Sequence, residues 1–366
     1  MQPVRMASSD VERHAVFRLR YRVFVEGLAR SDLDGADHGA RILTDELDAG
    51  GTHYYAGEPG QPVAALTASP LGTAALPQEL REFLDIPTLT QAAPLAQMAF
   101  TNWLVADSTE AGGQAVTALL MAAAEWALGE RMELLLTFCR PGLVSFYQRL
   151  GFEQYRPATD LKGLGLRCPL LLVLRDEARL RAVRSPLTRV LRRSEGVGSP
   201  DAVRLRLEPL IDLFQASQIL VTDDLWLEGG IQFVERARPR LFDGLSGESI
   251  RQVMRLASVI SCQAGETITR RNETSDDMFL VVAGQFMATG PTGATRVIGE
   301  GELFGEQEHL SGLPRSETVT AHSEGHVAAL KAGALFNWMR QNPEPGVTLA
   351  INLAKLLAMK LEWSRR

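Results

Sequence analysis

The chain has few cysteines, few lysines and no long apolar stretch. Its three cysteines among 366 residues stand far apart, which excludes a disulfide framework and a Cys-x-x-Cys metal site and predicts a reducing, cytoplasmic setting. Only four of the 38 basic residues are lysine, the arginine bias of a GC-rich bacterial genome. No apolar run approaches the roughly 20 residues of a membrane-spanning helix, and the first residues lack the apolar core of a secretory signal. The net charge of -6 argues against bulk binding of nucleic acid.

Helical and strand patterns alternate through the first half of the chain. Ser9 and Glu12 form a capping box, and apolar residues at helical spacing follow it. We expect helices over 9–28, 77–85, 114–129 and 141–150, and strands over 52–57, 61–69, 98–106, 132–138 and 168–176. This order predicts one mixed α/β domain, which we place at residues 1–193.

A linker and a different pattern follow. Residues 194–202 have the composition of a linker, and a helical stretch is expected over about 205–240, so we place a linker and helical segment over 194–240. From residue 241, short alternating strands are punctuated by glycines, which predicts a small β-barrel or jelly-roll sandwich over 241–366. An amphipathic helix is expected over 344–363.

The first candidate site is a glycine-rich turn between a predicted strand and a predicted helix. Backbone N–H groups at such a helix start bind phosphate. The small residues Gly112, Gly113 and Ala115 let a ligand approach the backbone. The alternative is a tight turn that binds nothing.

Gly-x-Ala at 113–115, together with Tyr-x-x-x-Gly-Phe at 147–152, resembles the GNAT N-acyltransferase superfamily. The resemblance implies a donor site for acyl-CoA, or for an acyl carrier protein thioester, in which the turn holds the pyrophosphate and the adjoining strand carries the pantetheine arm. The donor-binding residues that it implies are Val105, Gly112, Gly113, Gln114 and Ala115. It also implies that Tyr147 protonates the departing thiolate; the alternative is a packed core tyrosine.

Two further motifs narrow this resemblance. Arg-x-x-Val-Phe at 20–24 and Asp-x-x-Asp at 45–48, followed by His53-Tyr54, are similar to motifs of the N-acyl-homoserine-lactone and N-acyl amino acid synthases. Thr67 or Ala68 stands where those synthases carry an arginine. We therefore expect an N-acyltransferase for another amine, which is an amino acid, a small amine or a protein lysine.

The same resemblance implies roles for the polar residues of these motifs. Acceptor binding is assigned to Arg20, Phe24 and His53, and the carboxylate base that keeps the amine neutral to Glu26, Asp45 or Asp48. The alternatives are a satisfied core histidine and, for the two aspartates, loop caps and solvated charges.

An arginine run occupies Arg179–Arg193, with six arginines and no acid. One interpretation is a solvated helical face. The other is a docking site for an acidic acyl carrier protein, because clustered arginines pair with carboxylates and phosphate.

The second candidate site lies at residues 299–321, GEGELFGEQEHLSGLPRSETVTA. Phe-Gly-Glu, followed after eight residues by Arg-Ser, closely resembles the phosphate-binding cassette of cyclic-nucleotide-binding domains. The matching residues are Phe304, Gly305, Glu306, Arg315 and Ser316. An arginine gives charge-assisted hydrogen bonds to a cyclic phosphate, the glutamate accepts from the ribose 2′-hydroxyl, and N–H groups of a short helix complete the anion site.

The effector that this resemblance implies is cAMP or cGMP, and Ser316 does not decide between them. The alternative is a degenerate barrel kept for packing or for dimer formation. We expect no helix-turn-helix after the barrel, and therefore no transcription factor of the catabolite-activator type. The terminal helix is instead a candidate lid over the nucleotide.

Both sites together predict a GNAT-like mixed α/β domain followed by a jelly-roll β-barrel with flanking helices. The predicted function is transfer of an acyl group from a thioester to an amine under the control of a cyclic nucleotide. We expect no metal, no DNA partner and no membrane span, and a homodimer fits the barrel. The alternative function is a non-catalytic cyclic-nucleotide sensor that uses an acyltransferase-like domain to bind partners.

Overall fold

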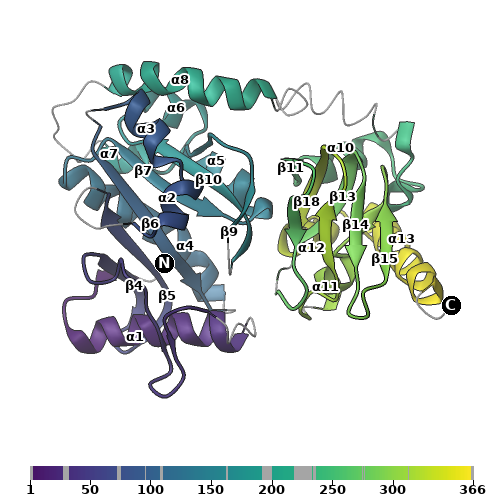
Figure 1. Ribbon diagram of the computed structural model, residues 1–366, viewed down its shortest axis with the longest axis horizontal. Helices are drawn as coiled ribbons and strands as arrows, with labels where there is room; N and C mark the ends of the chain where they lie inside the picture. Colours follow the sequence, from purple (N-terminus) through teal and green to yellow (C-terminus); the bar gives the residue numbers. More distant parts are fainter. Residues whose placement is uncertain are drawn as a thin grey trace. The chain divides into compact units, whose positions relative to one another are not determined.

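The chain folds into two compact units (Figure 1). The N-terminal unit comprises residues 1–139, 146–156 and 169–212, and the C-terminal unit comprises residues 140–145, 157–168 and 213–366. The computed structural model describes residues 3–27, 33–71, 76–94, 96–107, 110–161, 164–191, 200–217, 233, 236–273, 275, 277–311 and 313–363. Within these ranges, no helix combines the length and the apolar character needed to cross a membrane.

The first half of the chain forms a mixed sheet in the strand order β1-β4-β5-β6-β7-β10-β8, with β9 paired to β10. Its strands are β1 (Val4–Met6), β4 (Thr52–Glu58), β5 (Gln61–Pro70), β6 (Met98–Ala106), β7 (Leu134–Cys139), β8 (Glu153–Gln154), β9 (Thr159–Leu161) and β10 (Gly165–Val173). Neighbours from β1 to β6 pair antiparallel, whereas β6 and β7 run parallel. Each strand expected in this half is present.

The parallel pair β6–β7 is short, and β6 is irregular beyond it. Paired residues end at Phe100 and Leu136. Further along, the register of β6 against β5 shifts by one residue at a β-bulge beside Thr67. Trp103 lies in this bulge with a φ of 49°. Because a bulge redirects the side chains around it, Asn102 and Trp103 depart from the regular alternation of the strand.

The remaining elements between residues 1 and 217 are helices and one small hairpin. They are α1 (Asp10–Arg20), a π-helix (Tyr21–Gly27), β2 (Ala36–Asp37), β3 (Ile42–Leu43), α2 (Gln78–Phe83), α3 (Ile86–Ala92), α4 (Glu110–Gly129), a 3-10 turn (Pro141–Leu143), α5 (Val144–Leu150), α6 (Glu177–Ala182), α7 (Thr188–Leu191) and α8 (Pro200–Ser217). The capping box of Ser9 and Glu12 is confirmed at the start of α1. The linker and helical segment expected over 194–240 lie partly outside the described residues, and α8 occupies part of this range.

One helix prediction is incomplete and another needs correction. The helix expected over 77–85 is confirmed as α2, but a second helix, α3, was not predicted; it begins after Asp85, which has a φ of 49°. The helix expected to begin at residue 114 begins at Glu110. Gly112 and Gly113 therefore lie in its first turn and do not form a turn before it.

Two four-stranded antiparallel sheets form the C-terminal unit, in the orders β11-β18-β13-β16 and β12-β17-β14-β15. Their strands are β11 (Ser258–Cys262), β12 (Thr267–Thr269), β13 (Asp277–Ala283), β14 (Phe286–Thr289), β15 (Thr295–Ile298), β16 (Leu303–Phe304), β17 (Thr318–Ala321) and β18 (Gly325–Lys331). The expected β-sandwich is confirmed. Gly284 illustrates its turn glycines: φ is 85°, and a Cβ would lie 2.6 Å from the carbonyl oxygen of Glu324.

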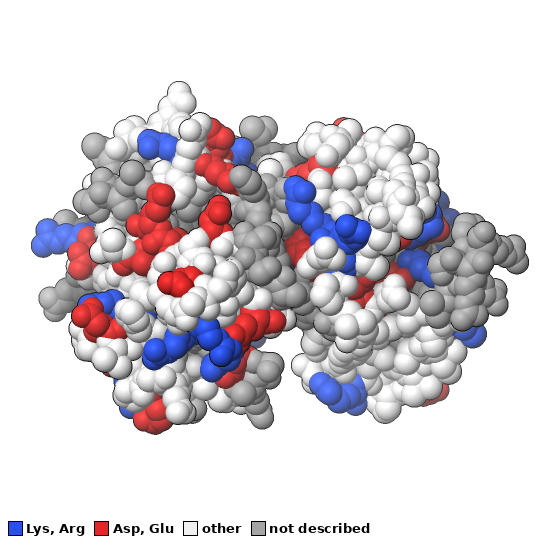
Figure 2. All heavy atoms as spheres, turned by 60° about the horizontal axis from the view of Figure 1, so that its bottom comes forward, with Lys and Arg blue, Asp and Glu red and all other residues white. Residues whose placement is uncertain are grey.

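Helices cover one sheet of this sandwich. They are a 3-10 turn (Arg240–Phe242), α10 (Gly247–Met254), α11 (Glu306–Ser311), α12 (Ala332–Gln341) and α13 (Pro343–Trp363). Leu349 and Leu353 of α13 pack in a buried apolar cluster with Phe242, Met254 and Leu330. The apolar face of α13 is thus committed to this core. On the face of the molecule drawn in Figure 2, acidic and basic side chains are interspersed among the described residues.

Candidate functional site

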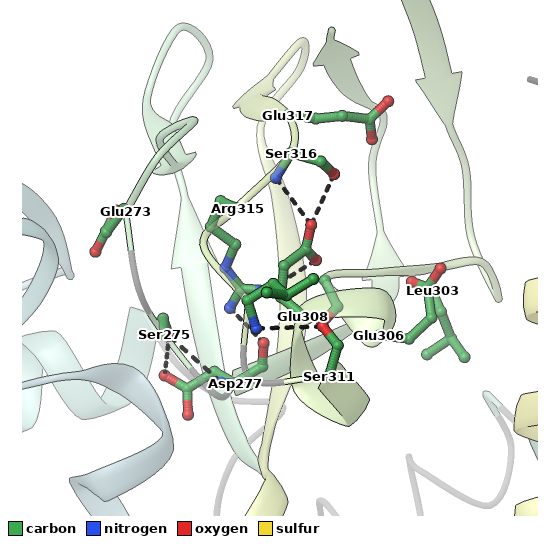
Figure 3. A network of polar contacts seen from close by, with 12 residues as sticks. Glu273, Ser275, Asp277, Leu303, Glu306, Glu308, Ser311, Arg315, Ser316 and Glu317 are labelled. Atoms are coloured by element: carbon green, nitrogen blue, oxygen red, sulfur yellow. Dashed lines mark hydrogen bonds and ion pairs between the residues drawn. The ribbon is translucent and has the colours of Figure 1, made fainter. Parts of the chain in front are cut away.

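The end of β16, helix α11 and the segment leading into β17 form the predicted cassette (Figure 3). Gly305 joins β16 to α11 with a φ of 75°. A Cβ at this position would overlap Nη1 of Arg315 and would lie 3.1 Å from the carbonyl oxygen of Asp277. Glycine is therefore required both by the backbone conformation and by the close approach of the arginine.

Arg315 is the buried cation of the cassette, with 2% of its surface exposed. Its backbone N–H donates to the carbonyl of Glu273, and its carbonyl accepts from the N–H of Asn272, both at 2.8 Å. Its Nη1 donates to the carbonyl oxygen of Gly305 at 3.0 Å, and its Nη2 donates to that of Asp277. Backbone groups therefore fix the orientation of the guanidinium.

A carboxylate lies against this guanidinium. Glu308 on α11 accepts from the N–H of Ser316 at 2.9 Å and from its hydroxyl at 2.7 Å, and its second oxygen lies 3.5 Å from Nη1 of Arg315. Burial raises the pKa of Glu308, but the hydrogen bonds from Ser316 and the charge of Arg315 outweigh that effect and hold the pKa below its usual value. Glu308 is therefore an anion at neutral pH.

Glu306, the first residue of α11, is also buried. Its Oε1 lies 2.7 Å from Nζ of Lys360 on α13, and the same ammonium donates to the carbonyl oxygen of Leu303 at 2.7 Å. Its Oε2 has no hydrogen-bond partner among the described residues. The terminal helix thus contacts the cassette through a lysine, and its leucines pack elsewhere.

The structure brings all five predicted cassette residues together. Phe304 completes the set by stacking on Phe279, with ring centroids 4.9 Å apart. Sequence reasoning missed Glu308, although an acidic residue two positions after Glu306 on a short helix was a usable signal. It also missed Asp277, because this residue contacts Arg315 through its backbone carbonyl oxygen, a contact that does not depend on the type of side chain.

A second polar cluster lies inside the N-terminal unit. Arg20, at the end of α1, is fully buried and donates from Nη1 to both oxygens of Asp48, at 2.9 and 2.8 Å. Its Nη2 donates to the hydroxyl of Thr67 on β5. That hydroxyl also lies 2.9 Å from Nδ1 of His53 on β4. The cluster therefore joins α1, the loop before β4 and two strands around one guanidinium.

Asp45 joins this cluster through the bulge of β6. It accepts from Nδ2 of Asn102 at 2.8 Å and from the indole N–H of Trp103. Burial and the neighbouring charge of Asp48 raise the pKa of Asp45. Burial and the charge of Arg20 lower the pKa of His53, so its imidazole is neutral at neutral pH.

Of the residues assigned to acceptor binding or to the base, Glu26 lies outside this cluster and the others lie in it or border it. Phe24 packs edge-on against Trp103, with centroids 5.2 Å apart, and so borders the cluster that contains Arg20, Asp45, Asp48 and His53. Glu26 instead accepts from Nε of Arg41 at 3.0 Å in an exposed ion pair.

Tyr147, the predicted general acid, is 2% exposed. The rings of Phe146 and Phe152 each lie with their centroids 5.4 Å from its own. Burial raises the pKa of its phenol. The hydroxyl is therefore protonated at neutral pH and packed within the core.

The predicted donor-binding residues divide into buried and exposed groups. Val105 and Ala115 are buried, and a Cβ on Gly112 would lie 2.9 Å from the carbonyl oxygen of Val63. These residues are small or apolar because other parts of the chain pack against them. Gly113 and Gln114 are exposed, and a Cβ on Gly113 would meet nothing within 4 Å.

Two arginines of the run 179–193 face acids of their own unit. Nε of Arg179 lies 3.9 Å from Glu153, and Arg181 pairs with Glu177. The last two arginines of the run lie outside the described residues.

Comparison with known proteins agrees with the geometry of the cassette. Residues 259–342 match the family model described as "Cyclic nucleotide-binding domain", so this part of the chain is a cyclic nucleotide-binding domain. A cyclic nucleotide-gated potassium channel of Rhizobium etli is 34% identical over 92 residues, which cover 25% of this chain and 26% of the channel. The CRP-like cAMP-activated global transcriptional regulator of Mycobacterium tuberculosis is 22% identical over 130 residues, which cover 34% of this chain and 56% of the regulator.

Among solved structures, the catabolite activator protein of Thermus thermophilus is 27% identical, with a TM-score of 0.31 and coverage of 34% of this chain and 60% of that one. The chain thus spans about a quarter of the channel and about half of the regulator. The residues that match the family lie in the C-terminal unit.

Gly305→Ala tests the close approach in the cassette. We expect it to lower the free energy of unfolding by at least about 1 kcal/mol more than Gly293→Ala, because overpacking adds to the cost of the left-handed backbone. Gly293 is the matched control: its φ is 82°, but a Cβ there would meet nothing within 4 Å. Urea unfolding measures both, and equal losses would contradict the packing described for Arg315.

Asp48→Ala tests the buried ion pair of the N-terminal unit. It leaves the guanidinium of Arg20 without its charge partner, so we expect a loss of about 3–5 kcal/mol in the free energy of unfolding. Asp10→Ala, which removes an exposed partner of Arg13, should cost under about 1 kcal/mol. A similar small loss for both variants, in urea unfolding followed by tryptophan fluorescence, would show that the pair is not a structural centre.

Proposed function

We propose that the chain is an N-acyltransferase whose activity is controlled by a cyclic nucleotide bound in its C-terminal unit. The observation that supports control by a nucleotide is the group of hydrogen-bond donors in the cassette. A fixed guanidinium, a backbone N–H and a hydroxyl converge from Arg315 and Ser316 on one anion. Charge-assisted donors in this arrangement suit a phosphate group, and Glu306 supplies a buried acceptor for a ribose hydroxyl.

The proposed acyltransferase activity is argued from the polar cluster around Arg20. Three buried atoms there have no hydrogen-bond partner among the described residues, namely Nε of Arg20, Nε2 of His53 and Oδ1 of Asn102. Buried polar atoms normally have partners, so these three favour a ligand or water at this place. An amine acceptor with its own polar groups fits a site that offers both donors and an acceptor.

Asp45 is the proposed base for this reaction. A carboxyl whose pKa is raised by burial accepts a proton more readily near neutral pH. In the transfer, the amine nitrogen bonds to the thioester carbon, the carbon–sulfur bond breaks, the amine proton passes to Asp45, and the thiolate takes a proton from Tyr147. The donor, acyl-CoA or an acyl carrier protein, is proposed to lie at the exposed Gly113 and Gln114, with the arginine run 179–193 as the surface for a carrier.

The burial of Tyr147 favours a second candidate function. A phenol packed between two phenylalanine rings is also what a non-catalytic unit would contain, and the chain would then be a cyclic-nucleotide sensor. A thioester-release assay with acetyl and long-chain acyl donors separates the two. Release that depends on an added amine supports the transferase, and its absence with every donor supports the sensor.

Arg315→Ala tests nucleotide binding. Removing the cation should weaken binding of cAMP or cGMP by about 100-fold or more, the scale of losing one partner of a buried charge pair. Arg296→Ala removes a partly exposed arginine that pairs with Glu317 and should leave affinity within about twofold. Calorimetry measures both, and equal affinity of Arg315→Ala and wild type would contradict the assignment.

Gly113→Asp tests the donor site. The position has room for a side chain, so the variant should fold, and its carboxylate should repel the donor phosphates and abolish donor binding. Gly113→Ala is the matched control and should bind within about threefold of wild type, because it adds volume without charge. Donor binding by calorimetry that is unchanged in Gly113→Asp would overturn the assignment.

A further inference from the structure

Every hydrogen that Ser316 can donate to the cassette is already given to Glu308. Its single N–H and its single hydroxyl hydrogen both bond Oε1 of that carboxylate, at 2.9 and 2.7 Å (Figure 3). Each of these groups has only one hydrogen to give. A phosphate oxygen cannot receive either bond until the carboxylate has left.

The guanidinium is engaged at both of its terminal nitrogens. Nη2 of Arg315 donates to the carbonyl of Asp277, and Nη1 is shared between the carbonyl of Gly305 and Glu308. Only Nε has no hydrogen-bond partner among the described residues. The anion-binding position of the cassette is therefore already occupied by the carboxylate of Glu308, a residue of the chain itself.

A carboxylate and a cyclic phosphate cannot share this position. Both carry negative charge, and two like charges within about 4–6 Å oppose each other's ionised state. The low pKa of Glu308 means that loss of its charge does not relieve this conflict at neutral pH. The side chain must move away, and the nucleotide must replace the contacts that it gives up.

We propose that Glu308 is an internal competitor of the nucleotide phosphate and sets the affinity of the cyclic-nucleotide site. This inference rests on the proposed nucleotide binding and adds to it a residue that holds the cassette closed to weakly binding anions. A ligand enters only if its phosphate and ribose contacts together exceed those of the Glu308 carboxylate.

The test compares affinities for cAMP and cGMP in the full-length chain. Glu308→Ala and Glu308→Gln remove the competing charge, and each should bind the preferred nucleotide about tenfold or more tightly than wild type. The glutamine variant keeps the size of the side chain, so it serves if the alanine variant folds poorly. Thermal unfolding without nucleotide reports the folded state of each variant.

Glu317→Gln is the matched control. It removes one negative charge from the residue after Ser316, but this side chain pairs with Arg296 and points away from the cassette in Figure 3. Its affinity should stay within about twofold of wild type. A gain equal to that of Glu308→Gln would show a general charge effect and would overturn the inference.

The remaining outcomes separate this inference from the proposed function. If wild type binds a nucleotide and both Glu308 variants bind it equally or more weakly, Glu308 supports the site and the inference is wrong, while nucleotide binding stands. If wild type and both folded variants bind neither nucleotide, removing the carboxylate has not opened the cassette, and both proposals fail.

Discussion

The buried guanidinium of Arg315 is the constraint on which the C-terminal unit depends. Leaving such a charge unpaired in the interior costs several kcal/mol, so the surrounding chain is arranged to satisfy it. Two backbone carbonyls, a glycine without a side chain and a carboxylate meet this demand. The same arrangement defines an anion site, because every donor that stabilises Glu308 would equally stabilise a phosphate.

Helix α11 connects this anion site to the terminal helix. Its six residues carry Glu308, which faces Arg315, and Glu306, which pairs with Lys360 of α13. A ligand that displaces the first carboxylate acts on the helix whose Glu306 pairs with Lys360 of α13. Control of a distant activity requires a nucleotide that binds two arrangements with different affinity, and a difference of about 1–3 kcal/mol would give about 5- to 150-fold regulation.

Features that depend on residues close together in the chain could be predicted from the sequence, whereas features that depend on contacts formed only in the folded chain could not. The cassette was predictable because Gly305, Glu306 and Arg315 belong to one short motif whose glycine is required by a local positive φ. The contact between Glu308 and Ser316 was not, since it depends on how the loop folds back over α11. In the N-terminal unit, the strands followed from apolar patterning, but the second helix after Asp85 and the early start of α4 were not predicted. The resemblance placed Arg20 and Asp48 at one acceptor site, but their direct ion pair was not predicted, because residues 28 positions apart in the chain form it.

The central claim is that a nucleotide phosphate and the Glu308 carboxylate occupy the same position. The most direct measurement is a crystal structure of the full-length chain with the cyclic nucleotide that it binds. The account predicts a phosphate oxygen within hydrogen-bond distance of the Ser316 N–H and of Arg315, with the Glu308 carboxylate turned away from both. A bound nucleotide with the contacts between Glu308 and Ser316 intact would contradict it.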